Sequence, residues 1–304
     1  LANFGNPAFT GTDQDDDNGY GSFEYDPPSG FLALCTKNLP KPDTIIIRPQ
    51  RHFDTILYTG DGQSNRKITG LEFKPGLVWL KQRAASGGGE IGEDHGWYDS
   101  VRGVTKRLKS NSSAAEDTSA IGSFDDGGFT FATETYYNDN NDTFVGWFWK
   151  AGDATVTNND GSITSSVSAN TEAGFSIVTW TGTGSDGTIG HGLGAVPSIY
   201  FVKRLNSAKD WYVQIGNIND ISLGRFLKLN SNTTINFASD VFAASADTST
   251  VLNTKSDSAT NATGDTYVAY CWAEIPGYSK FGFFKGNGST DGTFVHLGFR
   301  PAWL

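Results

Sequence analysis

Short apolar runs alternate with clusters of Gly, Asn, Asp and Ser along the whole 304-residue chain. Runs such as GLVWLK, TFVGWFW, FSIVTW and TYVAYCWAEI are rich in β-branched and aromatic residues, which are typical of strands. Asp-Gly pairs, which favour tight hairpin turns, lie between many of the runs. No long amphipathic helix is evident. This pattern predicts an all-β protein made of β-sandwiches.

The pattern also repeats. Three segments share an aromatic-x-Gly-x-Gly opening, a polar turn and a Pro before an apolar run: YTGDGQSNRKITGLEFKPGLVWLK, WTGTGSDGTIGHGLGAVPSIYFVK and FKGNGSTDGTFVHLGFRPAWL. Pro75 precedes Pro197 by the same number of residues as Gly60 precedes Gly182. The closing segments DTFVGWFWKAG and DTYVAYCWAEIPG keep that offset to within one residue. Agreement at both ends indicates a duplicated structural unit.

The repeat predicts four parts of the chain. Residues 1–50 are expected to be the closing strands of a preceding sandwich plus a linker. Residues 51–152 form the first sandwich, residues 153–275 a linker and the second, and residues 276–304 the start of a third. The closing segments carry large apolar side chains on both faces, so each is either central in a sandwich or covered by a neighbouring unit. We expect Trp149 and Trp272 to be buried equivalents.

Charge and cysteine content exclude several classes of protein. The net charge is −10 and no long Lys/Arg run occurs, which argues against nucleic acid as a partner. No apolar run is long enough for a membrane span, so membrane insertion is not expected. Cys35 and Cys271 are too far apart in sequence for a metal-binding pair and too few for a disulfide framework. The apolar run around Cys271 predicts a buried thiol.

Specific segments resemble a known family. GYGSFEYDPPSGFLALCTKNLP is similar to the end of SPRY-like, concanavalin-A-type domains in marine bacteriophage structural proteins. FDTILYTGDG, GLEFKPGLVWLK and DTFVGWFWKAG resemble the tandem β modules that follow such domains, in proteins labelled tail fibre or virion structural protein. The resemblance implies jelly-roll or concanavalin-like sandwiches, a location on the virion surface, other virion proteins as partners and a homo-oligomer, with a trimer favoured. It carries no active site.

Three functional classes follow. The first is a tail fibre or appendage component that supports host attachment without catalysis. The second is a carbohydrate-binding, lectin-like adhesin module, and the third is a glycan-degrading tailspike. Tandem repeats without a shared acidic pair favour the first class over the third.

Two groups of residues are candidates for catalysis. Glu90, Glu93, Asp94 and His95 cluster in a Gly-rich loop, but the second unit has no such cluster, which favours a solvated loop. The histidines show no metal-binding spacing. His191 and His296 occupy similar places in two units, which suggests structural hydrogen bonding.

One loop has the ligand spacing of a calcium site. Asp13, Asp15, Asp17 and Glu24 fall at positions 1, 3, 5 and 12 of an EF-hand-like loop. Asn18 stands where the turn glycine belongs, so an acidic surface loop is the alternative. Calcium is the one cofactor that the sequence suggests.

Recurrent aromatic pairs are candidates for sugar stacking, because a pyranose ring packs on Trp and Tyr faces. These residues are Trp97, Tyr98, Trp211 and Tyr212. Recurrence at fixed positions equally suits core packing, which is the alternative.

Overall fold

The computed structural model describes residues 14–21, 23, 25–35, 37–38, 48–88, 92–119, 121–133, 136–215, 225–233, 236–237, 241–243 and 247–304. The chain divides into two compact units, residues 1–45 and 46–304. The all-β prediction is confirmed, because helical residues in the described ranges are confined to two 3-10 turns, Pro49–Arg51 and Ser86–Gly88. Within those ranges, nothing helical has the length and apolar character that crossing a membrane requires.

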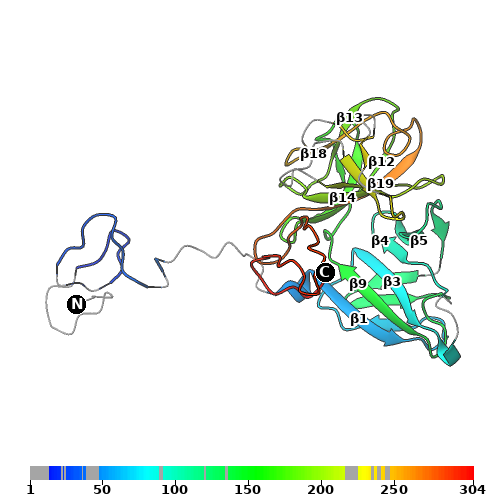
Figure 1. The fold of residues 1–304 in the computed structure, drawn as a ribbon, viewed down its shortest axis with the longest axis horizontal. Helices are drawn as coiled ribbons and strands as arrows, with labels where there is room; N and C mark the ends of the chain where they lie inside the picture. Colours follow the sequence, from blue (N-terminus) through cyan, green and yellow to red (C-terminus); the bar gives the residue numbers. More distant parts are fainter. Residues whose placement is uncertain are drawn as a thin grey trace. The chain divides into compact units, whose positions relative to one another are not determined.

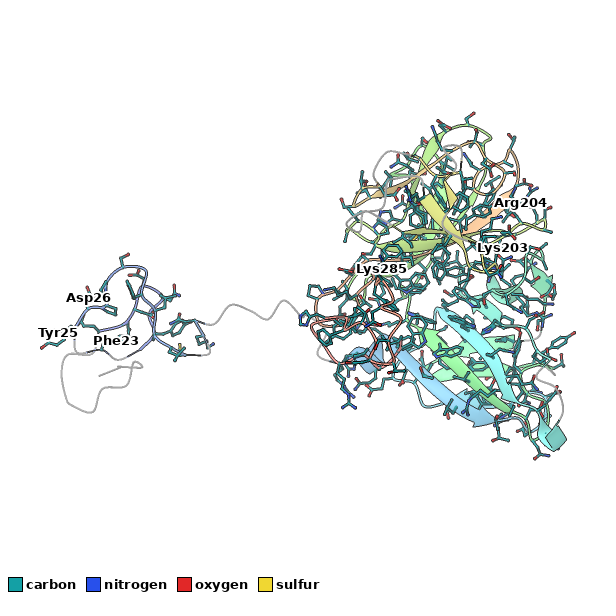
Figure 2. All side chains as sticks on the ribbon, in the orientation of Figure 1. Phe23, Tyr25, Asp26, Lys203, Arg204 and Lys285 are labelled. Carbon is teal, nitrogen blue, oxygen red and sulfur yellow. The ribbon has the colours of Figure 1, made fainter. Side chains whose placement is uncertain are left out.

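The N-terminal unit is organised around one carboxylate. Asp16 is buried and accepts hydrogen bonds from the backbone N–H groups of Ala33 (2.7 Å) and Tyr20 (3.0 Å). Among this unit's described residues the only β pairing is a bridge between Gln14 and Phe23. The closing strands of a preceding sandwich that the sequence predicts in residues 1–50 fall in part on residues outside the described ranges, and they stay a prediction. Tyr25 is 78% exposed and projects from the loop (Figure 2).

The first sandwich in residues 46–304 has a large and a small antiparallel sheet. The large sheet has the order β1-β9-β3-β4-β5-β6, and the small one β2-β8-β7. The strands of the large sheet are β1 (Phe53–Thr59), β9 (Thr143–Trp149), β3 (Leu77–Ala84), β4 (Gly96–Asp99), β5 (Gly103–Lys109) and β6 (Asp117–Thr118). Those of the small sheet are β2 (Lys67–Thr69), β8 (Gly128–Phe131) and β7 (Ile121–Asp125).

The second sandwich repeats this strand order. Its large sheet runs β10-β11-β12-β19-β14-β15-β16-β17, and its small sheet is β13-β18. Figure 1 labels β12, β19 and β14 of the large sheet and both strands of the small one. The strands of the large sheet are β10 (Val156–Asn158), β11 (Ser165–Asn170), β12 (Phe175–Thr181), β19 (Thr266–Trp272), β14 (Ile199–Arg204), β15 (Tyr212–Ile215), β16 (Arg225–Lys228) and β17 (Asn236–Phe237). Those of the small sheet are β13 (Gly187–Gly190) and β18 (Val251–Thr254). The order β12-β19-β14-β15-β16-β17 matches that of the first large sheet, and β10-β11 is an added hairpin at one edge.

The repeated Gly-x-Gly motif has two physical causes. A Cβ on Gly60 would collide with the carbonyl oxygen of Asp139, and a Cβ on Gly182 would collide with that of Ala262. The second glycines, Gly62 and Gly184, have φ of 65° and 75°, a conformation that favours glycine. The first glycine therefore permits close backbone approach and the second permits the turn.

Each sandwich has its own core between its two sheets. In the first, Val78 and Phe148 of the large sheet pack with Phe129 of the small sheet. In the second, Val178 and Cys271 pack with Leu252. Cys271 is fully buried, as predicted, and burial raises the pKa of its thiol.

A third core lies between the two sandwiches. Alternate residues of each large sheet point away from its own small sheet and pack against the other large sheet. Trp149 and Trp272, 7% and 9% exposed, are buried equivalents, as predicted, and both lie in this shared core. The strands that are apolar on both faces are therefore covered by the neighbouring unit. Burying an aromatic side chain in such a core stabilises the fold by about 2–3 kcal/mol.

The expected start of a third sandwich is not formed. Residues 276–304 are all described and contain no strand beyond the bridge between Ile275 and Ser279. In the first two units the opening strand pairs with the closing strand of the same unit, and this sequence holds no third closing segment. Trp303 instead packs on Trp149, with 5.8 Å between ring centroids.

Candidate functional site

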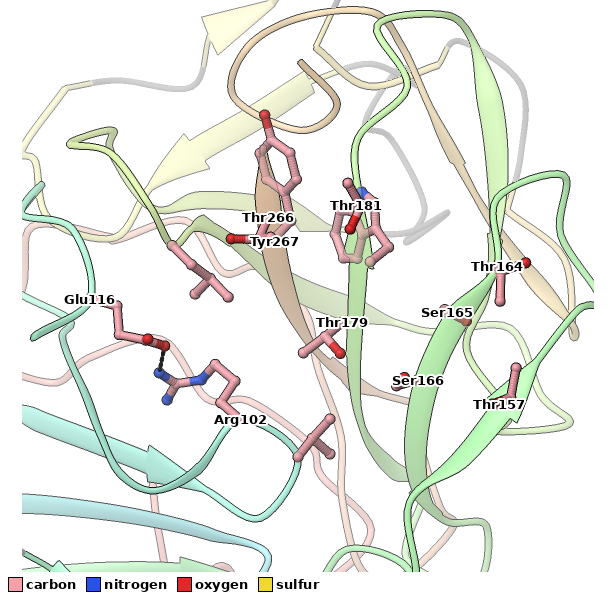
Figure 3. Close-up of a pocket in the computed structure, with 13 residues that line it drawn as sticks. Arg102, Glu116, Thr157, Thr164, Ser165, Ser166, Thr179, Thr181, Thr266 and Tyr267 are labelled. Atoms are coloured by element: carbon pink, nitrogen blue, oxygen red, sulfur yellow. Dashed lines mark hydrogen bonds and ion pairs between the residues drawn. The ribbon is translucent and has the colours of Figure 1, made fainter. Parts of the chain in front are cut away.

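A polar groove of about 390 Å³ lies where a loop of the first sandwich approaches the outer strands of the second (Figure 3). Its floor is the face of β10, β11, β12 and β19 that points toward the first sandwich. Six hydroxyl side chains line this floor: Thr157, Thr164, Ser166, Thr179, Thr181 and Thr266.

The register of the strands arranges these hydroxyls in rows. Thr157 is opposite Ser166, and Ser166 is opposite Thr179, so one row crosses three strands. Thr181 is opposite Thr266 and stands two residues from Thr179, so it belongs to a second row on the same face. Neighbouring strands are about 5 Å apart, and alternate residues along a strand are about 7 Å apart.

Most of these hydroxyls make no hydrogen bond to another described residue. Thr164 Oγ1 donates to Asn159 Oδ1 (3.0 Å). Within the part of the chain that the structure describes, the side-chain hydroxyls of Thr157, Ser166, Thr179 and Thr181 make no hydrogen bond to protein. These groups can therefore bond water or a ligand.

The same face is apolar further along the strands. Ile177 and Tyr270 are opposite each other in register and are fully buried in the shared core. Two residues further along β12 stands Thr179, which is half-buried, and two further again Thr181, which is exposed. The face thus changes from apolar to hydroxyl-bearing where the first sandwich ceases to cover it.

Two loops of the first sandwich, joined by ion pairs, form the opposite wall. Arg102 Nη1 lies 2.9 Å from Glu116 Oε2, and Arg102 Nε lies 2.5 Å from Asp99 Oδ2. Burial disfavours the charged guanidinium, but Asp99, Tyr270 and Glu116 outweigh it and raise the pKa of Arg102. Glu116 also pairs with Lys106 at 3.2 Å. The charges of this wall are mutually neutralised.

Hydrogen bonds between the sandwiches hold this wall against the second sandwich. Tyr270 Oη donates to Asp99 Oδ2 at 2.6 Å. The backbone N–H of Glu116 donates to the carbonyl of Leu205 at 2.8 Å. The turn that carries Arg102 and the segment that carries Glu116 are therefore each bonded to the second sandwich, which gives the groove a defined width.

A buried lysine lies at the junction of the two sandwiches. Lys203 is fully buried and donates from Nζ to the carbonyls of Arg204 (2.8 Å) and Ser113 (3.3 Å). Burial lowers its pKa to about 8. The contact with Ser113 joins the two sandwiches, and Lys203 and Arg204 lie in the second sandwich (Figure 2).

The family described as Domain of unknown function (DUF7483) matches residues 48–304. The chain belongs to this family. The matched range covers both sandwiches and the C-terminal segment, and it includes every residue of the groove. Searches of curated proteins and of solved structures each found no significant match.

In this DUF7483 chain the four recurrent aromatics are core residues. Trp97 and Trp211 meet in the shared core with 5.3 Å between ring centroids, and Trp211 Nε1 donates to the carbonyl of Lys109 at 2.8 Å. Tyr98 lies in the first core and Tyr212 in the second. At 0–7% exposure none offers a free ring face. The sugar-stacking hypothesis for these residues is therefore wrong for this structure, because they recur as packing positions.

Only two of the four proposed calcium ligands lie in the described residues. Asp13 and Glu24 lie outside the described residues. Asp15 and Asp17 are exposed, and Asp17 Oδ2 accepts from the backbone N–H of Gly30 at 2.8 Å. Within the described ranges, no three His, Cys, Asp or Glu side chains are placed to hold a metal ion.

Two carboxylates of the acidic loop, Glu93 and Asp94, lie in the described residues, and Asp94 is held by hydrogen bonds. Glu90 lies outside the described residues. Burial opposes ionisation of Asp94, but a hydrogen bond from Asn111 and the nearby Lys109 outweigh it and lower its pKa. His95 Nδ1 accepts from Trp79 Nε1 at 2.8 Å. These contacts fit a structural loop.

His191 and His296, which occupy similar places in the sequence repeat, differ in burial and in hydrogen bonding. His191 is fully buried, accepts from the backbone N–H of Leu193 (3.2 Å), and its Nε2 lies 3.1 Å from the carbonyl of Thr248. Its structural role agrees with the prediction. His296 is exposed in the C-terminal segment and has no equivalent contact in the described residues.

Sequence reasoning missed the hydroxyl-lined groove. The signal was present as alternation in SITSSVSAN and SIVTWTG, where small polar residues occupy every second position. Only the strand register shows that these hydroxyls share one face.

Proposed function

We propose that this chain is a bacteriophage virion structural protein, a tail fibre or appendage component that supports attachment to the host. The observation that carries the proposal is the shared aromatic core between two equivalent sandwiches. Such a core packs the repeated units against each other, and a fibre must hold its tip at a fixed distance from the particle. The family resemblance of the tandem modules supports the same reading.

We also propose that the chain is not an enzyme. Among the described residues, Glu116 is the only carboxylate that lines the groove, and it is paired with both Arg102 and Lys106. Glycoside hydrolysis ordinarily needs two carboxyl groups facing the same bond, one of them a proton donor. The groove therefore suits binding better than hydrolysis.

Assembly is part of the proposal. A homo-oligomer, with a trimer favoured, would multiply weak receptor contacts into useful avidity. Other virion proteins are its expected partners, and the net charge of −10 suits an exposed, soluble particle surface.

Antibody labelling of parent phage particles tests this function. Particles are incubated with a gold-labelled antibody raised against residues 46–304 and viewed by electron microscopy. Labelling of tails, fibres or other appendages is the expected result. Unlabelled intact particles, with the protein also missing from their mass spectra, would overturn the proposal.

A lectin-like adhesin module is the second candidate, and the hydroxyl-lined groove favours it. The two candidates differ in location. An adhesin would be found on a cell surface and be missing from purified particles, so the same antibody separates them.

A further inference from the structure

We infer that the groove between the two sandwiches binds a neutral oligosaccharide. The hydroxyls of Ser166 and Thr179 on the floor, with the ion-paired Arg102 and Glu116 on the wall, form the binding surface. The inference deepens the proposed attachment function and rests on it for biological meaning. The groove itself is a physical feature that can be tested alone.

The lining selects the chemical class of the ligand. An anion would need an unpaired cation, but the Arg102 guanidinium is occupied by Asp99 and Glu116. A cation would need an unpaired carboxylate, and Glu116 already contacts two basic side chains. An apolar ligand would leave the floor hydroxyls without hydrogen bonds, which costs free energy.

A polyhydroxylated ligand matches what remains. Each Ser or Thr hydroxyl offers one donor and two acceptor lone pairs, and a sugar offers the same groups in return. Rows spaced about 5 Å by about 7 Å can engage several hydroxyls at once, directly or through water. The volume of about 390 Å³ is within the range of small-ligand sites.

The site is also preorganised. Its floor is a sheet with fixed register, and its wall is held by the Tyr270–Asp99 hydrogen bond and the Glu116–Leu205 backbone bond. Rigid elements lose little conformational entropy when a ligand binds. The groove is lined by residues of both sandwiches, so it forms only where the two pack together.

Binding is tested with the full chain and a panel of neutral trisaccharides: maltotriose, cellotriose, mannotriose and chitotriose. Sialyllactose and a sulfated disaccharide are the charged comparators. Titration calorimetry and ligand-observed NMR measure affinity up to millimolar concentrations. At least one neutral sugar should bind, and bind more tightly than either charged comparator.

Paired variants locate the site. Thr179→Val removes a floor hydroxyl and keeps the shape of the side chain, and the double variant with Ser166→Ala should weaken binding about tenfold or more. Thr55→Val is the matched control, because Thr55 is an exposed strand threonine of β1 outside the groove. It should leave affinity unchanged. Melting temperatures of all variants show whether the fold is intact.

Several outcomes would overturn the inference. These are no neutral sugar bound at millimolar concentration, preference for a charged comparator, or equal affinity in the folded double variant. If no sugar bound but the antibody labelled virions, the sugar-binding inference would fail and the proposed function would still hold. If the protein bound sugar but the antibody did not label virions, the sugar site would be supported and the virion function would be rejected.

Discussion

The rings of Trp149 and Trp272 meet nearly perpendicular, with 6.1 Å between their centroids. The two residues end equivalent strands, β9 and β19, of two different sandwiches. The two sandwiches therefore contact each other through the same position of the repeat. A change at either residue should affect both sandwiches.

Replacing Trp149 or Trp272 with Ala should lower the free energy of unfolding by about 3–5 kcal/mol, because each change leaves a cavity in the shared core. Denaturant unfolding followed by tryptophan fluorescence and circular dichroism measures it. Trp303→Ala is the control, since Trp303 is 46% exposed and should have a much smaller effect. Unchanged midpoints for both core variants would contradict this.

Tyr270→Phe should destabilise the junction by about 1–3 kcal/mol, because it removes the hydroxyl that donates to buried Asp99. Tyr212→Phe is the matched control. Tyr212 is also buried, and among the described residues its hydroxyl has no hydrogen-bond partner. Equal stabilities of the two variants would count against the role of the Tyr270–Asp99 bond.

Stability should depend on pH through Asp247. Burial raises the pKa of Asp247 to about 6, so its contribution to stability is fully present below pH of about 4 and is lost as pH rises through about 6. Asp247→Asn keeps an acceptor for the backbone N–H of Asn253 and should stabilise the protein at pH 7 by up to about 3 kcal/mol.

Chemical unfolding at pH 4, 5, 6 and 7 measures the difference between Asp247→Asn and the parent. That difference should grow with pH across this window. Asp153→Asn removes the same charge from a side chain that is 94% exposed and should give a small, nearly constant difference. If the difference in unfolding free energy between Asp247→Asn and the parent did not change with pH, the raised pKa of Asp247 would be refuted.

The first sandwich should not be stable alone. A fragment of residues 46–152 would expose the face that carries Trp97 and Trp149. We expect it to bind a hydrophobic dye, to self-associate and to unfold at lower temperature than residues 46–304. A monomeric fragment that melts at the same temperature as residues 46–304 would show that the shared core is not needed.

The sequence alone determined the all-β class and the duplication, because period-two alternation and a conserved spacing of glycine and proline are local properties of the chain. It also determined that Trp149, Trp272 and Cys271 are buried, since each stands in a run that is apolar on both faces. These conclusions need no knowledge of which strands pair.

Tertiary structure decided what covers each face. Alternation in β12 shows that Ile177 and Thr179 share a side, but not that the first sandwich covers one and leaves the other open. The same holds for Trp97 and Trp211, which looked equally suited to a sugar platform or a core. Burial and the groove depend on the contact between two sheets that are far apart in sequence, and such long-range packing leaves no local signal in the chain.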